Sequence, residues 1–452
     1  MSQASVTAGP SAAIRAANYR RVQMDSVFIG VVNASGTFLP VFLLRMGASA
    51  SDVGLLTALP ALTAFLLAIP FGRWLQPRGQ IVKWYSRLRL IAWSSYAVMA
   101  VVTAVLPREH AIPVLLLVWA LASLPSTAAL VTFALVMDGA AGPGGRFDLL
   151  GRRWAIAGVS ATIAVALIGQ LLTYVAFPLN FEVFLFLVTL AGFGSFLQSS
   201  RIQIVDAPKV SIAPPEAAAV TVTAAATASR GSPAVRRQDR LRSLWRLVAS
   251  NRSFVRFEMR GFVYVLSIGV AMPVLPLFYV HELGAPDAWI GIIGAASSAG
   301  SVLGYLGARQ LSRRRGGSVT LLPSLLAMAA GPLVLSTISW LPAVAAVAFA
   351  TGVAAAGAQL AMFDQLMRRI PAEHGVTFSS VDQSISNLAI VIGPNVGGLL
   401  AVAIGVRSTM LFITAIGLVA FGLFFVESRR PATAHGIPAV TPPDRTGRTS
   451  TA

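Results

Sequence analysis

The sequence predicts an all-α membrane protein with twelve transmembrane helices in two pseudo-symmetric six-helix bundles. Three observations support this fold class: a strongly apolar composition, apolar stretches of membrane-spanning length, and an internal repeat. Of the 452 residues, 56% are apolar and 12% are charged, and the mean hydropathy is +0.73. An average soluble domain carries about 25% charged residues. The composition therefore excludes an ordinary soluble globular protein.

The predicted helices are apolar stretches that recur between short polar breaks. Crossing about 30 Å of hydrocarbon takes roughly 20 predominantly apolar residues in a helix. The first half of the chain carries stretches of this length at 24–44, 53–75, 88–106, 112–137, 154–176 and 181–200. The second half carries them at 257–280, 288–308, 318–339, 342–363, 378–404 and 408–426. We therefore expect six helices in each half.

One long polar segment separates the two sets of helices. Residues 201–253 are rich in Ala, Thr, Ser and Pro, which is typical of a flexible linker. We expect a cytoplasmic and partly disordered linker here, between six-helix bundles at 21–200 and 254–428. Residues 1–20 and 429–452 are expected to be cytoplasmic tails, the second of them disordered.

The basic residues predict the orientation of the helices. The formal net charge is +18, from 35 basic and 17 acidic residues. With the N-terminus inside, only Arg45, Arg108 and Arg407 fall outside, and Arg260 falls just inside the seventh helix. Cytoplasmic loops are enriched in Lys and Arg. We expect a multi-pass protein of the plasma (inner) membrane with both termini cytoplasmic, and no binding of nucleic acid.

An internal repeat relates the two halves. Residues 39–54 are LPVFLLRMGASASDVG, and residues 275–291 are LPLFYVHELGAPDAWIG, one residue longer. Both copies begin within a predicted helix that starts on the cytoplasmic side, so the halves are expected to run in parallel. Parallel repeats are related by an axis along the membrane normal.

These features resemble the major facilitator superfamily over roughly residues 20–428. The loop from Gly72, GRWLQPRGQIVKW, is similar to a basic loop motif of that family, although Gln76 stands where an aspartate is usual. A second copy from Gly307, GARQLSRRRGG, keeps the basic cluster and also lacks the acid. The resemblance implies transport by alternating access, in which two halves rock about a central site.

The same resemblance implies charged latches at the cytoplasmic gate. Family members often pair an acid at the end of the fourth helix with an arginine of the basic loop. This implies a pair between Asp138 and Arg73 or Arg78, and its counterpart between Asp364 and the arginine cluster around Arg313. The alternative for both acids is helix capping by charge at a water-accessible end.

Asp382 is the candidate proton-coupling residue. It lies a few residues into the eleventh predicted helix, in the run SSVDQSISNLAIVIGPNVGG. A partly desolvated carboxylate binds protons more readily, and ionisable groups within the membrane are candidate functional sites. The alternative is a structural charge that favours the N-terminal helix dipole.

Uncharged polar residues in the apolar spans are candidates for a substrate cavity. Ser and Thr hydroxyl groups often bond only to their own helix backbone. Longer amides and a tyrosine are better candidates to line a cavity, and we assign Asn33, Gln170, Tyr264, Gln359 and Asn387 to it.

A run of small residues in the eleventh helix is expected to bend it. Gly393, Pro394, Gly397 and Gly398 form a GPxxGG sequence, and glycine and proline permit bending and close packing. The run resembles a motif that antiporters of the family carry in the fifth helix, which favours export. Here it lies in the pseudo-equivalent helix of the other half.

The remaining motifs point away from an enzyme. The sequence has no cysteine, no GxxxxGK[ST] phosphate loop and no HExxH run, and its four histidines are scattered. We expect no catalytic residues, no metal and no cofactor. The expected protein is a monomeric secondary transporter, coupled to protons, for a small neutral, amphipathic or weakly cationic organic solute. A non-transporting assembly or pigment-handling factor of the same fold is the alternative, and import and export both stay open.

Overall fold

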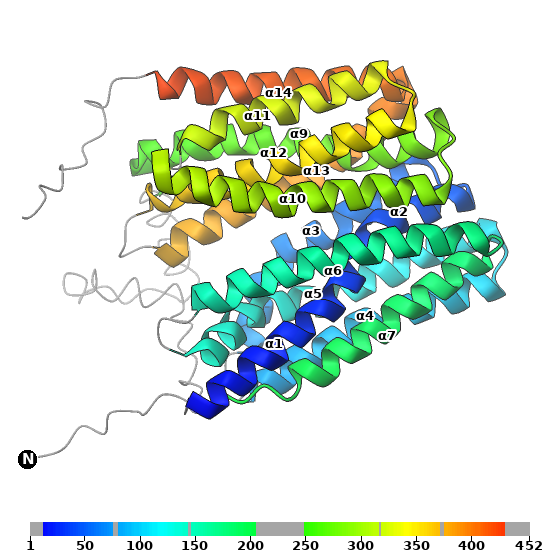
Figure 1. The fold of residues 1–452 in the computed structure, drawn as a ribbon, viewed down its shortest axis with the longest axis horizontal. Coiled ribbons are helices and arrows are strands. Elements are labelled where there is room, and N and C mark those ends of the chain that lie inside the picture. The colour runs from blue at the N-terminus through cyan, green and yellow to red at the C-terminus, as the bar shows by residue number, and fades with distance from the viewer. Residues whose placement is uncertain are drawn as a thin grey trace, which may run out of the picture.

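Helices form almost the whole of the described chain. The computed structural model describes residues 12–75, 80–142, 146–204, 248–315, 318–370 and 375–429, and these contain helices but no strand. Figure 1 shows two groups of roughly aligned helices, one from each half of the chain, stacked side by side. The predicted tails and most of the predicted linker lie outside the described residues.

The first half contains six membrane-spanning units. Its helices are α1 (Ala12–Asn33), α2 (Ser35–Met46), α3 (Ala50–Leu75), α4 (Ile81–Val105), α5 (Arg108–Ala141), α6 (Arg146–Tyr174) and α7 (Leu179–Ser199). Helices α1 and α2 follow each other almost directly and form one span, Ala12–Met46.

The second half repeats this arrangement. Its helices are α9 (Arg252–Leu277), the π-helical turn η2 (Phe278–Glu282), α10 (Asp287–Arg315), α11 (Ser318–Thr337), α12 (Leu341–Met367), α13 (Gly375–Ile404) and α14 (Val406–Ser428). In all, 12 helices among the described residues are long and apolar enough to cross a membrane. The predicted all-α fold with twelve spans is confirmed.

The apolar side chains explain why these segments are helical and why they suit lipid. A helix satisfies its own backbone hydrogen bonds, as hydrocarbon demands. Large apolar side chains cover the outside of the bundle, including Leu167, Leu399 and Val402, which are 65%, 65% and 73% exposed. In water such exposure would be costly, whereas lipid tails accommodate it.

Contacts between the halves are concentrated at one end of the molecule. The helices pack across the boundary as α6 against α10 and α3 against α13. At one end, a Cβ added to Gly169 of α6 would lie 2.6 Å from the Cα atom of Gly291 of α10. Further along the same helices, Gly151 and Gly307 have no such neighbour within 4 Å. Between these positions, a Cβ at Gly158 of α6 would still lie 2.9 Å from the Val302 side chain of α10, so the two halves separate along α6 and α10 only beyond this point.

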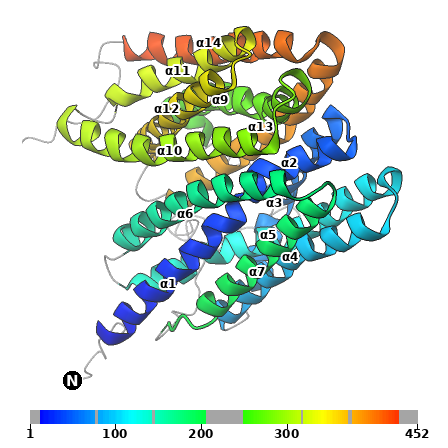
Figure 2. The same ribbon diagram turned by 45° about the vertical axis from the view of Figure 1, so that its right-hand side comes forward.

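Figures 1 and 2 show the same divergence in the ribbons. The described chain begins and ends, at Ala12 and Arg429, on the side where the halves diverge. We call this side the terminal end and the opposite side, where the halves meet, the closed end.

The internal repeat has a structural explanation at η2. In the first half, α2 ends directly at Gly47, which has a φ of 97°. In the second half, α9 continues into η2, where the amide of Leu283 donates to the carbonyl of Phe278 at 3.0 Å. A π turn holds one more residue than an α turn. The extra residue of the second copy of the repeat is therefore accommodated in η2.

The helices extend further toward the terminal end than the apolar stretches predict. Helix α4 begins at Ile81 rather than near 88, and α6 begins at Arg146 rather than near 154. Arg89 and Arg153, which we expected in cytoplasmic segments, therefore lie on helices, where both are buried. Asp25, near the start of the first predicted helix, and Glu258 and Arg260, near the start of the seventh, are likewise buried, at most 9% exposed.

Candidate functional site

The first transmembrane helix of the first half has a local irregularity at Ala34, which keeps helical dihedral angles (φ −60°, ψ −23°). Helix α1 ends at Asn33, α2 begins at Ser35, and the amide of Ala34 donates to the carbonyl of Val31 at 3.1 Å. The Asn33 side chain is exposed at this irregularity, and the Ser35 hydroxyl group lies 2.7 Å from that of Tyr96 on α4.

The predicted cavity residues are distributed over both halves. Asn33, Gln170 of α6 and Gln359 of α12 are exposed, whereas Asn387 of α13 is half-buried and Tyr264 of α9 is buried. Gln170 directly follows Gly169, so it lies near the closed end, beside the contact between α6 and α10. The five predicted cavity residues are thus uncharged polar side chains that lie on five different helices.

Three of the polar groups of the second half lie together. The hydroxyl group of Tyr305 on α10 donates to the side-chain oxygen of Gln359 on α12. Tyr305 also interacts electrostatically with Tyr264 of α9. This cluster presents hydroxyl and amide groups, which suit an uncharged polar part of a ligand.

Asp382 lies on α13 and is half-buried. It is seven residues after the first residue of α13, about 10 Å along the helix axis. Glu258 of α9, buried to 4% exposure, interacts electrostatically with it. On the next turn of α13, Gln383 donates to the Asn387 side chain at 3.3 Å. We did not expect Glu258 to be a partner of Asp382.

The predicted gate residues lie at the terminal end. Asp138 is exposed near the end of α5. Asp364, near the end of α12, pairs with Arg368 one turn later at 2.9 Å. Arg78 and the side chains of Arg73 and Arg313 lie outside the described residues, so neither predicted latch is visible.

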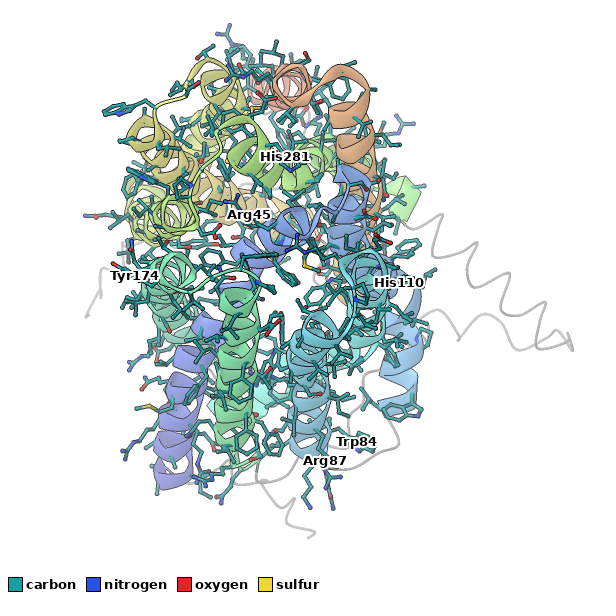
Figure 3. All side chains as sticks on the ribbon, turned by 90° about the vertical axis from the view of Figure 1, so that its right-hand side faces the viewer. Arg45, Trp84, Arg87, His110, Tyr174 and His281 are labelled. Atoms are coloured by element: carbon teal, nitrogen blue, oxygen red, sulfur yellow. The ribbon has the colours of Figure 1, made fainter. Side chains whose placement is uncertain are left out.

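A charged contact joins the halves at the closed end. Arg45, in the last turn of α2, donates to the carbonyl of Ala285 at 2.8 Å and to the carboxylate of Asp287 at 3.2 Å. Asp287 is the first residue of α10, so the contact crosses from one half to the other. Figure 3, viewed from the closed end, shows Arg45 between the two groups of helices.

A cavity of about 420 Å³ adjoins this contact. It is lined by Arg45, Arg108, Leu172, Thr173, Val175, Phe177, Asn180, Pro286 and Asp287. The sequence offered a signal for Arg45, because it is one of the few basic residues placed outside. Its partner was not identifiable, since the two residues are 242 positions apart.

A buried ion network stabilises the first half. Asp25 of α1 accepts from Arg89 of α4 at 2.9 Å and from Arg153 of α6 at 2.5 Å. The hydroxyl group of Ser195 on α7 also donates to Asp25, and Arg89 donates to Tyr85 at 2.9 Å. One carboxylate thus connects four helices. The network has one more cation than anion, but it is almost completely buried and so does not bind a solute from water.

The second half has a smaller ion pair at the corresponding place. Arg260 of α9 pairs with Glu427 of α14 at 2.9 Å, and both side chains are nearly buried. No group of three His, Cys, Asp or Glu side chains that could hold a metal ion occurs within the described ranges.

The GPxxGG run is a packing surface of α13. A Cβ at Gly393 would lie 2.7 Å from the Cα atom of Gly269 on α9, within the same half. A Cβ at Gly398 would lie 2.8 Å from the carbonyl oxygen of Ala50 on α3, in the other half. The run thus brings α13 close to helices of both halves, and Pro394 lies inside an uninterrupted α13.

The two six-helix halves meet at one end and diverge at the other, and known proteins share this arrangement. A model of the Major Facilitator Superfamily matches residues 261–447. No curated relative matches the chain. The match to the family model confirms the resemblance to the major facilitator superfamily over the second half of the chain.

Solved transporter structures have the same fold. A mutant of the nucleoside transporter NupG has a TM-score of 0.67 and 11% identity, over 90% of this chain and 99% of that chain. A bacterial homolog of the human lysosomal transporter Spinster, inward-facing and unoccupied, has a TM-score of 0.66 and 14% identity, over 93% of this chain and 98% of that chain. An inward-facing bacterial homologue of the iron transporter ferroportin has a TM-score of 0.67 and 14% identity, over 91% of this chain and 99% of that chain.

Proposed function

We propose that this protein is a proton-coupled secondary active transporter that moves a small organic solute by alternating access. One observation carries the proposal: the halves pack tightly at the closed end and separate toward the terminal end along α6 and α10. This is the arrangement of one state of a transporter whose halves rock about a central site. The other state would close the terminal end and open the end that is now closed.

The proposed orientation places the terminal end in the cytoplasm of a cell bounded by a plasma (inner) membrane. The distribution of basic residues in the sequence supports it, since cytoplasmic segments are enriched in Lys and Arg. The solved Spinster and ferroportin homologues are likewise described as inward-facing. The present structure is then the inward-facing state of a monomeric transporter.

The proposed solute is neutral, amphipathic or weakly cationic. Asn33, Gln359 and Tyr305 offer exposed amide and hydroxyl groups without charge. The buried arginines of the first half, Arg89 and Arg153, are both bonded to Asp25. They are therefore not available to bind the phosphate or carboxylate groups of a strongly anionic solute.

The proposed gate at the terminal end uses Asp138 and Asp364. Both carboxylates lie near helix ends on the side where the halves diverge. When the halves close there, Asp138 would pair with Arg73 or Arg78, and Asp364 would exchange Arg368 for the arginines around Arg313. In this account the latches stabilise the outward-facing state.

Transport into proteoliposomes with an imposed pH gradient tests the proposed function. The solute panel includes nucleosides, lipophilic amines, neutral amphipathic drugs and divalent metal ions. We expect at least one organic solute to accumulate against its gradient, and a protonophore to abolish accumulation. The polarity of the effective pH gradient identifies import or export.

Two variants on α13 test whether Asp382 couples transport to protons in this experiment. Asp382→Asn is expected to keep exchange of the solute but lose uphill accumulation. Ser384→Ala, whose hydroxyl group bonds to the Ser380 carbonyl of its own helix at 2.8 Å, serves as the matched control and is expected to keep both. Absence of transport for the whole panel would favour the non-transporting scaffold, and retained uphill transport in Asp382→Asn would reject its coupling role.

A further inference from the structure

Glu258 is a buried carboxyl group with no counter-charge in the part of the chain that the structure describes. It lies six residues after the start of α9, about 9 Å along the axis, and only 4% of it is exposed. Its Oε1 atom is buried and has no hydrogen-bond partner among the described residues. A buried carboxylate without a partner is costly, and such a group takes up a proton or binds a cation instead.

The cations around Glu258 are engaged elsewhere. Arg260, one half-turn along α9, is paired with Glu427 of α14. Arg369, after the end of α12, donates to Gln365 and lies 4.9 Å from the Phe257 ring. The other charged groups on α9 and on the elements that pack against it are also engaged: Arg256 bonds to the Arg252 carbonyl, Asp364 pairs with Arg368, and Arg45 pairs with Asp287 at the closed end. Arg407 of α14 pairs with Glu282 of η2, and Asp52 of α3 accepts from the Ser49 hydroxyl group. His281 of η2 is exposed, and the Arg73 side chain is outside the described residues.

The charged group that does interact with Glu258 has the same sign. Asp382 lies on α13, which packs extensively against α9, and its interaction with Glu258 is repulsive when both are ionised. Two carboxyl groups that share a site do not both ionise readily. Asp382 is half-buried, whereas Glu258 is buried, so water has access to the pair through Asp382.

We propose that Glu258 and Asp382 form a proton-sharing carboxyl pair, in which Glu258 holds the transported proton and Asp382 exchanges it with water. Loading transfers one proton from a hydronium ion in the solvent to a carboxylate oxygen of Asp382, leaving water, and then to Glu258, and it changes the charge of the pair from −2 to −1. No other bond forms or breaks. The inference rests on the proposed transport function, which it deepens by naming a second coupling residue.

Infrared spectroscopy of the full-length protein in lipid vesicles tests the proposal without any solute. A protonated carboxyl group gives a C=O stretching band that is separate from the carboxylate bands and shifts in D₂O. We expect this band in the wild-type protein at neutral pH, its loss on alkaline titration, and its loss in Glu258→Gln. In Asp382→Asn, which removes the neighbouring negative charge, the remaining band is expected to disappear at lower pH.

Control variants establish whether the band belongs to Glu258. Asp148→Asn removes an exposed carboxylate in the first half and should leave the band unchanged. If Glu258→Gln does not fold, Glu258→Asp keeps the carboxyl group and should shift the titration. A band that persists in Glu258→Gln overturns the proposal, as does a Na⁺-dependent spectrum without a protonated carboxyl band. If Glu258→Gln loses the band but no solute is transported, the proton site stands and the transport function fails.

Discussion

At the residue scale, the interior of the first half depends on one carboxylate. Asp25 is 1% exposed and bonds to Arg89 and Arg153, which lie 64 and 128 positions away in the sequence. The two guanidinium groups also pack on aromatic rings, with Arg89 4.3 Å from Trp93 and Arg153 5.2 Å from Phe133. Cation–π contacts and ion pairs are strongest where water is excluded. The network therefore fixes the positions of several helices relative to one another.

Replacing this carboxylate is expected to destabilise the protein. Asp25→Asn leaves two buried guanidinium groups without an anion, and breaking a buried pair in this way costs about 3–5 kcal/mol. We expect a clear fall in the thermal midpoint of the purified protein in detergent. The matched control is Asp148→Asn, which breaks the exposed pair with Arg152, where exposed pairs contribute about 0–1 kcal/mol. Equal midpoints for the two variants would show that the network is not stabilising.

Sequence reasoning identified polar residues at this scale but not their partners. Asp382 was conspicuous as an acid inside an apolar stretch, and Arg45 as a basic residue on the less basic side. Arg89 and Arg153 were counted with the cytoplasmic basic residues, because they lie at the start of one apolar stretch and just before another, whereas the helices begin earlier and bury both side chains. Their pairing with Asp25 depends on how α1, α4 and α6 pack, which a single sequence does not specify.

At the element scale, the two copies of the internal repeat differ by one π turn. The insertion was visible as one extra residue in the second copy, and the structure places it in η2, at the closed end of α9. The irregularity between α1 and α2 carried no such sign, since Asn33, Ala34 and Ser35 include neither Gly nor Pro. Propensity alone did not predict the irregularity at Ala34.

Close packing of α6 and α10 keeps the closed end shut. A Cβ at Gly291 would lie 2.7 Å from the Cα atom of Gly169, a distance at which the helices must move apart. Next to this contact, a Cβ at Gly294 would lie 2.9 Å from the Thr37 side chain of α2. Gly291→Ala is therefore expected to open the closed end and make Thr37 accessible.

The absence of cysteine from the sequence makes this prediction easy to measure. In a Thr37→Cys background, Gly291→Ala should raise the labelling rate by a membrane-impermeant maleimide several-fold. Gly307→Ala, on the same helix α10 but without a neighbour within 4 Å, is the matched control and should leave the rate unchanged. The same rate in both variants would mean that this glycine contact does not hold the halves together.

At the scale of the whole molecule, the sequence predicts the fold but does not predict which end of the molecule is closed. Hydrocarbon leaves few options for a chain with twelve apolar stretches, so their number, lengths and repeat predicted the architecture. Which end is closed depends on the balance between two packings of the same halves. Such packings differ by a few kcal/mol, and no composition or spacing reveals that difference.

The central claim is that the halves exchange which end is closed, and distances between spin labels test it most directly. One pair of cysteines replaces His110, near the start of α5, and His281 of η2, where these elements reach the closed end. The other pair replaces Arg152 of α6 and Gln310 of α10, both exposed near the terminal end. Double electron–electron resonance in lipid vesicles then reports both distances as the pH is changed.

We predict reciprocal changes: as the population shifts, the distance at the closed end gains a longer component while the distance at the terminal end gains a shorter one. The Asp148→Asn background should behave as the wild-type protein does. Distances that stay fixed at both ends over the whole pH range and with every solute of the panel would contradict alternating access, and would indicate a static scaffold of the same fold.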